Sequence, residues 1–256
     1  MSRIISVAKN TFREAIRDRV LYNLILFFLL ITASANFLGE LTAGNEARTI
    51  VNMGLAASLI FGVLIAIFVG VGLVSKEIEK RTIYAIFAKP IRREEFLLGK
   101  FLGLCVTLLV NTFIMGIGIS LALLYVGDKV RLLAVWIAIF LIYIELCLMV
   151  AVAMLFSSFS SPALSALFSF SIFIIGHLSS SLKDLAQELG SQSAKIFFTT
   201  LYYVLPNLSH FNFITQASHG EVPQYDFIIV VVVYAIIYAC ILLSISLYIF
   251  SNRDFK

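Results

Sequence analysis

Long apolar runs, separated by short charged stretches, dominate the chain from residue 20 to its C-terminal end. A helix needs about 20 largely apolar residues to cross a bilayer, since each residue rises about 1.5 Å. Six runs qualify: residues 20–38, 50–75, 101–127, 132–156, 164–182 and 227–250. Only the fourth contains an acidic or basic residue, Glu145, whereas the fifth is rich in serine and contains His177. The pattern predicts an all-α membrane protein, with residues 1–256 as one domain.

The first 19 residues follow a different pattern, with apolar and basic positions on opposite sides of a helical wheel. Such a segment is typical of a helix that lies along the membrane surface, where basic groups meet anionic headgroups. We therefore predict an interfacial helix at residues 1–19. The apolar half contains Ile4, Ile5, Val7, Ala8, Thr11, Phe12, Ala15 and Ile16, and the polar half contains Arg3, Lys9, Asn10, Arg13 and Arg17.

Composition excludes a soluble enzyme. The chain is 61% hydrophobic and 13% charged, whereas soluble domains are about 45–50% apolar and about 25% charged. If the N-terminus is cytoplasmic, 14 basic residues lie inside and 5 outside. The positive-inside rule then places both termini in the cytoplasm, as six crossings require.

The inner segment 76–100 has eleven charges between two crossings that have none. Pro90 is expected to end a helix near Lys89, and Glu94 and Glu95 would lie in the first turn of the third crossing, where acidic groups favour the helix dipole. Within it, residues 83–88 form an apolar and aromatic stretch, IYAIFA. Such a stretch usually marks a partner surface, although it could pack on the protein's own helix ends.

The outer segment 183–226 is net −2, yet its residues 196–213 are rich in aromatics and contain Pro206. This stretch is too short and polar for a secure crossing, so we predict a re-entrant or interfacial element. A seventh crossing here would instead move the C-terminus outside.

The chain contains none of the catalytic motifs that a membrane protease or a lipid-processing enzyme would need. The chain has no G-x-S-x-G, H-E-x-x-H or phosphate-loop motif, so it is not expected to be an enzyme. Its three cysteines, Cys105, Cys147 and Cys240, lie in apolar runs without metal-ligand spacing, and no metal site is predicted.

Three polar residues inside the predicted crossings are candidate functional groups: Glu145, His177 and Asn111. Glu145 could bind a cationic group, relay a proton, or remain protonated and bond a neighbouring helix, and His177 could be its partner. Small-residue ridges that let helices approach closely occur at Gly62, Ala66 and Gly70, and at Gly99 and Gly103.

This organisation resembles the membrane subunit of a type 2, exporter-like ABC transporter. The family's cytosolic segment often has glutamates, Gly-Thr, a proline with a following arginine, and Gly-Lys. Arg81 stands where the family has glycine, and residues 205–207, Leu-Pro-Asn, resemble a Leu-Pro step of relatives. The matching positions here are Glu77, Glu79, Thr82, Pro90, Arg92 or Arg93, and Gly99-Lys100.

The resemblance implies a permease subunit, in a prokaryotic plasma or inner membrane, that exports a substrate with energy from a separate ATPase. That ATPase would bind ATP and Mg, so this chain needs no cofactor. Two copies, or this chain and a similar permease, would pair within the lipid, without nucleic acid. The coupling residues would be Glu77, Glu79, Arg81, Thr82, Ile83, Tyr84, Ile86, Phe87, Pro90, Arg92 and Arg93.

Other readings of the sequence compete with this one. An ion-coupled secondary transporter would use Glu145 and His177 as its coupling groups. A membrane enzyme ranks third, because no reactive constellation is found. An assembly scaffold ranks fourth, and failure to co-purify with an ATPase would favour it. The sequence contains no recognisable substrate motif.

Overall fold

The computed structural model describes residues 2–15, 26–27, 45–79, 92–179 and 192–252. Within these ranges the chain forms eight α-helices and one short 3-10 helix, which confirms the all-α prediction. The elements are α1 (Ser2–Ala15), α3 (Glu46–Glu79), α5 (Arg93–Val126), α6 (Leu132–Phe159), α7 (Pro162–His177), α9 (Gln192–Val204), η2 (Leu208–Phe211), α10 (Ile214–Ser218) and α11 (Tyr225–Asn252).

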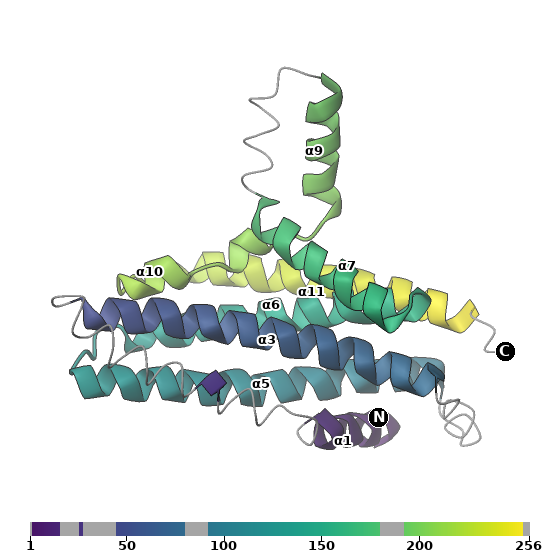
Figure 1. The fold of residues 1–256 in the computed structure, drawn as a ribbon, viewed down its shortest axis with the longest axis horizontal. Coiled ribbons are helices and arrows are strands. Elements are labelled where there is room, and N and C mark those ends of the chain that lie inside the picture. The colour runs from purple at the N-terminus through teal and green to yellow at the C-terminus, as the bar shows by residue number, and fades with distance from the viewer. Residues whose placement is uncertain (1, 16–25, 28–44, 80–91, 180–191, 253–256) are drawn as a thin grey trace.

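Four long helices, α3, α5, α6 and α11, run along the length of the molecule (Figure 1). Each is long and apolar enough to span a membrane. The central helix is α6, which contacts α3, α5, α7 and α11. It is apolar on all sides, as expected for a helix enclosed by others. The apolar core follows this helix, with Leu141, Leu148 and Met149 fully buried.

Local signals at the helix ends agree with the sequence pattern. At the start of α5, the backbone N–H of Arg92 donates to Glu95, and Glu94 and Glu95 lie in its first turn. Its end is marked by Gly127, whose φ of 86° favours a residue without a Cβ. The start of α7 has Pro162 in its first turn, where the missing N–H costs nothing.

The predicted crossings are found in part. Helices α3, α5, α6 and α11 cover the second, third, fourth and sixth, although α5 begins eight residues before the predicted boundary. The fifth, predicted over residues 164–182, is the 16-residue helix α7. At about 1.5 Å per residue, this helix is shorter than a bilayer requires. The first predicted crossing lies outside the described residues except for 26 and 27.

Helix α1 packs against the first turns of α5 (Figure 1). Its Thr11 and Ala15 are fully buried, whereas Arg3, Lys9 and Arg13 are exposed. The described part of the predicted interfacial helix is therefore amphipathic as expected. We call the end of the bundle that carries α1 the inner end, following the predicted orientation, and the opposite end, where α3 begins, the outer end.

The described residues between α7 and α11, which are 178–179 and 192–224, do not form one more long helix. Helix α9 stands out from the side of the bundle (Figure 1), and its side chains Ile196, Phe197 and Tyr203 are exposed. The chain then returns to the bundle, because Leu208 and Phe211 of η2 are fully buried and η2 contacts α6 and α7.

Candidate functional site

The predicted coupling segment joins the inner ends of α3 and α5. Glu77 and Glu79 lie in the last turns of α3, and Arg92 and Arg93 lie at the start of α5. The remaining coupling positions are outside the described residues: Arg81, Thr82, Ile83, Tyr84, Ile86, Phe87 and Pro90. The structure therefore places the two ends of this segment and leaves its central positions as predictions.

Arg93 joins α5 to the C-terminal end of α11. Its Nη1 donates to the carbonyl oxygens of Phe250, at 3.2 Å, and Ser251, at 2.6 Å. A helix leaves its last carbonyls without intrahelical partners, and a cation there also favours the dipole. The rings of Phe96 and Phe250 stack beside this contact, with centroids 6.4 Å apart.

Ionic contacts join α1 to the same part of α5. Lys100 is 2% exposed, and its Nζ lies 3.6 Å from a carboxylate oxygen of Glu14 and 5.5 Å from the ring centroid of Phe96. Arg3 and Glu95 form a looser, more exposed pair at 3.9 Å. Because Lys100 is buried, loss of its partner Glu14 would cost more free energy of unfolding than loss of the exposed pair. Helices α1, α5 and α11 thus meet beside the coupling segment.

Helix α1 packs against Gly99 and Gly103, which the sequence predicts to form a packing ridge. A Cβ built at Gly99 would lie 2.6 Å from Cβ of Val7, and one at Gly103 would lie 2.7 Å from the carbonyl oxygen of Ala8. Only glycine lets the two backbones approach this closely. The second predicted ridge, which includes Gly62 and Gly70, faces α6 instead.

Glu145 and His177 come together in the middle of the bundle. The Glu145 side chain is completely buried, and its Oε1 lies 3.6 Å from Nδ1 of His177, across the α6–α7 contact. This separation is longer than a hydrogen bond, which spans about 2.7–3.2 Å. Neither carboxyl oxygen of Glu145 has a hydrogen-bond partner among the described residues.

Asn111 lies at about the same level of the bundle. A Cβ at Gly54 would contact Ile119 and one at Gly70 would lie near Leu104, so the antiparallel register places Asn111 opposite Gly62. Gly62 in turn faces Leu146, the residue after Glu145. Asn111 is 1% exposed, and its amide has no hydrogen-bond partner in the described part of the chain. The three predicted intramembrane polar residues therefore share one layer.

A polar cluster around Asn207, which we call the Asn207 cluster, joins the outer segment to α7 and α11. Asn207 is 6% exposed, and its Oδ1 accepts from the hydroxyls of Ser179 and Ser209, each at 2.5 Å. Its backbone N–H donates to the Tyr234 hydroxyl at 2.9 Å. Its members are Ser179 after α7, Tyr202 on α9, Asn207, Ser209 and His210 on η2, and Tyr234 on α11.

This cluster could hardly be predicted from the sequence, because Ser179, Asn207 and Tyr234 are distant along the chain. The only local signal was the Leu-Pro-Asn step at residues 205–207. Gly176 makes the arrangement possible: a Cβ there would lie 2.8 Å from the carbonyl oxygen of Pro206 and 2.7 Å from Leu208.

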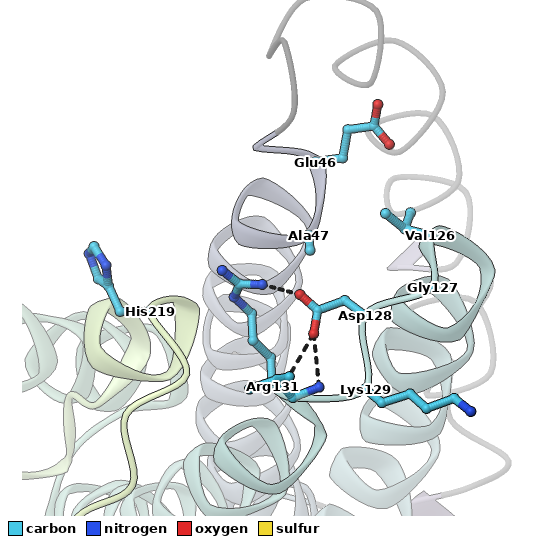
Figure 2. Close-up of a pocket in the computed structure, with 9 residues that line it drawn as sticks. Glu46, Ala47, Val126, Gly127, Asp128, Lys129, Arg131 and His219 are labelled. Atoms are coloured by element: carbon cyan, nitrogen blue, oxygen red, sulfur yellow. Dashed lines mark hydrogen bonds and ion pairs between the residues drawn. The ribbon is translucent and has the colours of Figure 1, made fainter.

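A depression of about 610 Å³ opens at the outer end, between the start of α3, the α5–α6 turn and the end of α10 (Figure 2). Arg131 pairs with Asp128 and donates to the carbonyl oxygen of Ser218 at 2.8 Å. Arg48, on α3 nearby, contacts Nε2 of His219 at 2.7 Å. These contacts engage Arg131 and His219 with neighbouring elements, whereas Lys129 points away (Figure 2).

The described residues contain no group of three or more His, Cys, Asp or Glu side chains arranged to hold a metal ion. The cysteines are free thiols. Cys105 lies on α5 and Cys147 on α6, two helices that pack against each other.

Comparison with known proteins yields one family. A family model described as ABC-2 family transporter protein matches residues 5–255, which is nearly the whole chain. No curated protein matches the chain.

Proposed function

The chain belongs to the ABC-2 transporter family, and from this premise we propose that it exports a substrate across a prokaryotic plasma or inner membrane. Members of this family are integral membrane permeases without a catalytic ATPase domain, and they work with ATPase subunits. ATP and Mg would therefore be bound by a partner. This chain would act as a dimer, with itself or with a similar permease, and its termini would face the cytoplasm.

The observation that carries the proposal is the junction at the inner end. Three helices that are distant in sequence, α1, α5 and α11, meet where the coupling segment enters α5. The contacts of Arg93 with α11 and of Lys100 with Glu14 would make these helices move together. A displacement of the coupling segment by the ATPase would then reach α3 and α5 directly, and α1 and α11 through these contacts. Packed rigid elements with two arrangements are what such transmission requires.

The coupling segment would present Ile83, Tyr84, Ile86 and Phe87 to a groove of the ATPase, with Arg81 and Arg92 setting the register. The substitution Phe87→Asp places a charge in this apolar contact, which would lose more than 1 kcal/mol if the residue is an interface hot spot. We expect the full-length variant to insert normally but to lose its ATPase from the complex purified from native membranes, and to lose ATP-driven transport in proteoliposomes.

Phe197→Asp is the matched control, because Phe197 is an exposed apolar residue of α9, away from the inner end. The control should retain the ATPase. Unchanged recruitment and transport in Phe87→Asp would refute the coupling role.

The contact between Glu145 and His177 also suits the ion-coupled alternative, since ionisable groups within spans often mark ion pathways. Proteoliposomes separate the two mechanisms. ATP-driven transport without a proton gradient supports the ATPase mechanism, whereas transport that follows the gradient and ignores ATP supports the alternative.

A further inference from the structure

We propose that Glu145 and His177 form a buried site that binds one proton and that this proton links α7 to α6. The inference is independent of the ATPase coupling proposed above. It starts from a carboxyl group that is 0% exposed and has no hydrogen-bond partner among the described residues. A bare carboxylate in such surroundings is expensive, so the group needs a proton or a cation beside it.

The chemistry of the pair favours one proton. With one proton, the pair is either a carboxylic acid beside a neutral imidazole or a carboxylate beside an imidazolium, and both arrangements are electrically neutral overall. With no proton, the pair has an uncompensated negative charge, and with two it has a positive one. A low-dielectric interior disfavours both charged states.

The geometry allows the shared proton to act as a link. Nδ1 of His177 and Oε1 of Glu145 are 3.6 Å apart, so an approach of less than about 1 Å forms a hydrogen bond. Otherwise α7 rests on α6 largely through apolar contacts, such as that between Phe156 and Phe168, whose ring centroids are 5.5 Å apart. A hydrogen bond at the C-terminal end of α7 would fix its position on α6.

Described neighbours leave the pair without a fixed counter-charge. Asn111, at the same level, is neutral. The charged residues of α3 lie at its two ends, far from Gly62. His210 of η2 is bonded to Asn207. The titratable and charged groups on the elements packed against α7 or α6 are Tyr143, Glu145 and Cys147 on α6, Glu46, Arg48, Lys76, Glu77 and Glu79 on α3, His210 on η2, Arg93, Glu94, Glu95, Lys100, Cys105 and Tyr125 on α5, His219 after α10, and Tyr225, Asp226, Tyr234, Tyr238, Cys240 and Tyr248 on α11.

The link would extend to the outer segment. Ser179, two residues after His177, donates to Asn207, and Gly176 packs against Pro206 and Leu208. The end of α7 is therefore held by Glu145 on one side and by the Asn207 cluster on the other. Proton occupancy would thus set the position of the outer segment relative to α6.

The test is the pH dependence of unfolding of the full-length chain in lipid nanodiscs. An unfolded chain loses its histidine proton above about pH 6.5, whereas the folded pair would keep one proton. Folding then binds a proton above this pH, so the folded state loses stability as pH rises. We expect the unfolding equilibrium constant of the wild type to rise up to tenfold per pH unit above about pH 6.5, until the pair releases its proton.

Glu145→Gln removes the proton requirement, because an amide can donate to the imidazole without one. Its unfolding constant should be flat above about pH 6.5. Glu221→Gln, the same change at an exposed glutamate, should behave like the wild type. A wild-type profile that is flat in this range, or a Glu145→Gln profile with the wild-type slope, would overturn the proposal.

A second measurement covers the case in which Glu145→Gln does not fold. The wild type in nanodiscs at about pH 7.5 should show either the infrared carbonyl band of a protonated carboxyl or the nitrogen NMR signal of an imidazolium, because exposed carboxyl and histidine groups give neither at this pH. Absence of both signals would mean that the pair holds no proton.

Discussion

Replacing Gly103 with alanine tests whether α1 is held on α5 by backbone contact. The new Cβ would lie 2.6 Å from Cβ of Thr11 and 2.7 Å from the carbonyl oxygen of Ala8. Neither atom is the end of a flexible side chain, so neither can move unless α1 moves as a whole. We therefore expect Gly103→Ala to displace α1 from α5 and to separate Glu14 from Lys100.

The magnitude follows from two opposing effects. Overpacking of a well-packed contact costs about 1–3 kcal/mol, and alanine in a helix interior regains about 0.5–1 kcal/mol relative to glycine. The net loss in the free energy of unfolding therefore ranges from about 0 to about 2.5 kcal/mol and is centred near about 1.2 kcal/mol. For a domain of this size, each 1 kcal/mol lowers the melting temperature by about 2–4 °C, so the central value predicts a decrease of about 2–5 °C.

Two measurements on the full-length chain in detergent check this prediction: the melting temperature, and hydrogen exchange of the α1 amides followed by mass spectrometry. Gly70→Ala is the control, because its Cβ would lie 3.3 Å from Cβ of Ala153 and 3.9 Å from the next atom, a contact that needs only a small adjustment. It should leave α1 protected. If Gly103→Ala leaves both the exchange of α1 and the melting temperature unchanged, α1 is not docked on this ridge.

Two further substitutions test the polar contacts. Arg93→Ala removes both hydrogen bonds to the last carbonyls of α11. We therefore expect the free energy of unfolding to fall by about 1 kcal/mol and hydrogen exchange to become faster in the last turn of that helix. Arg93→Lys should retain part of the stabilisation. Asn207→Ala removes the acceptor of the Ser179 hydroxyl. We therefore expect the free energy of unfolding to fall by about 1–3 kcal/mol, which is measured as a lower melting temperature. Asn207→Asp keeps the acceptor and should be intermediate, and equal melting temperatures for all three chains would contradict a structural role for Asn207.

The long helices could be predicted because the information for them is local. A long apolar run specifies α6 or α11 wherever its neighbours lie, and Glu94 and Glu95 mark the start of α5 as expected. The predicted start of the third crossing, residue 101, still differs from the start of α5. The helix begins at Arg93, within a charged stretch that a hydropathy window excludes. Helix formation needs only satisfied backbone groups, and charged residues can supply the turns that extend past the apolar run.

The limits of α7 depended on tertiary contacts. Its apolar and serine-rich pattern continues to Leu182, but the helix ends at His177, next to the place where Gly176 meets the chain around Pro206. Similarly, the small-residue pattern identified Gly99 and Gly103 as a packing ridge without identifying α1 as its partner. Which surface fills a ridge is decided by the fold of the whole chain, which a local pattern does not contain.

For the intramembrane residues too, the residue types could be recognised in the sequence, whereas their arrangement could not. Glu145 and His177 could be singled out because ionisable groups within apolar runs are costly, but their contact arises from the packing of α7 on α6. The inner end and the middle of the bundle also differ in how their helices are joined. At the inner end, close backbone packing and ionic contacts join α1, α5 and α11, whereas α7 is joined to α6 by apolar contacts and one protonatable pair, and to η2 by the packing of Gly176 and by the Asn207 cluster. We therefore expect motion that begins at the coupling segment to carry the inner junction as a unit, and the packing of α7 on α6 to be the contact that yields first.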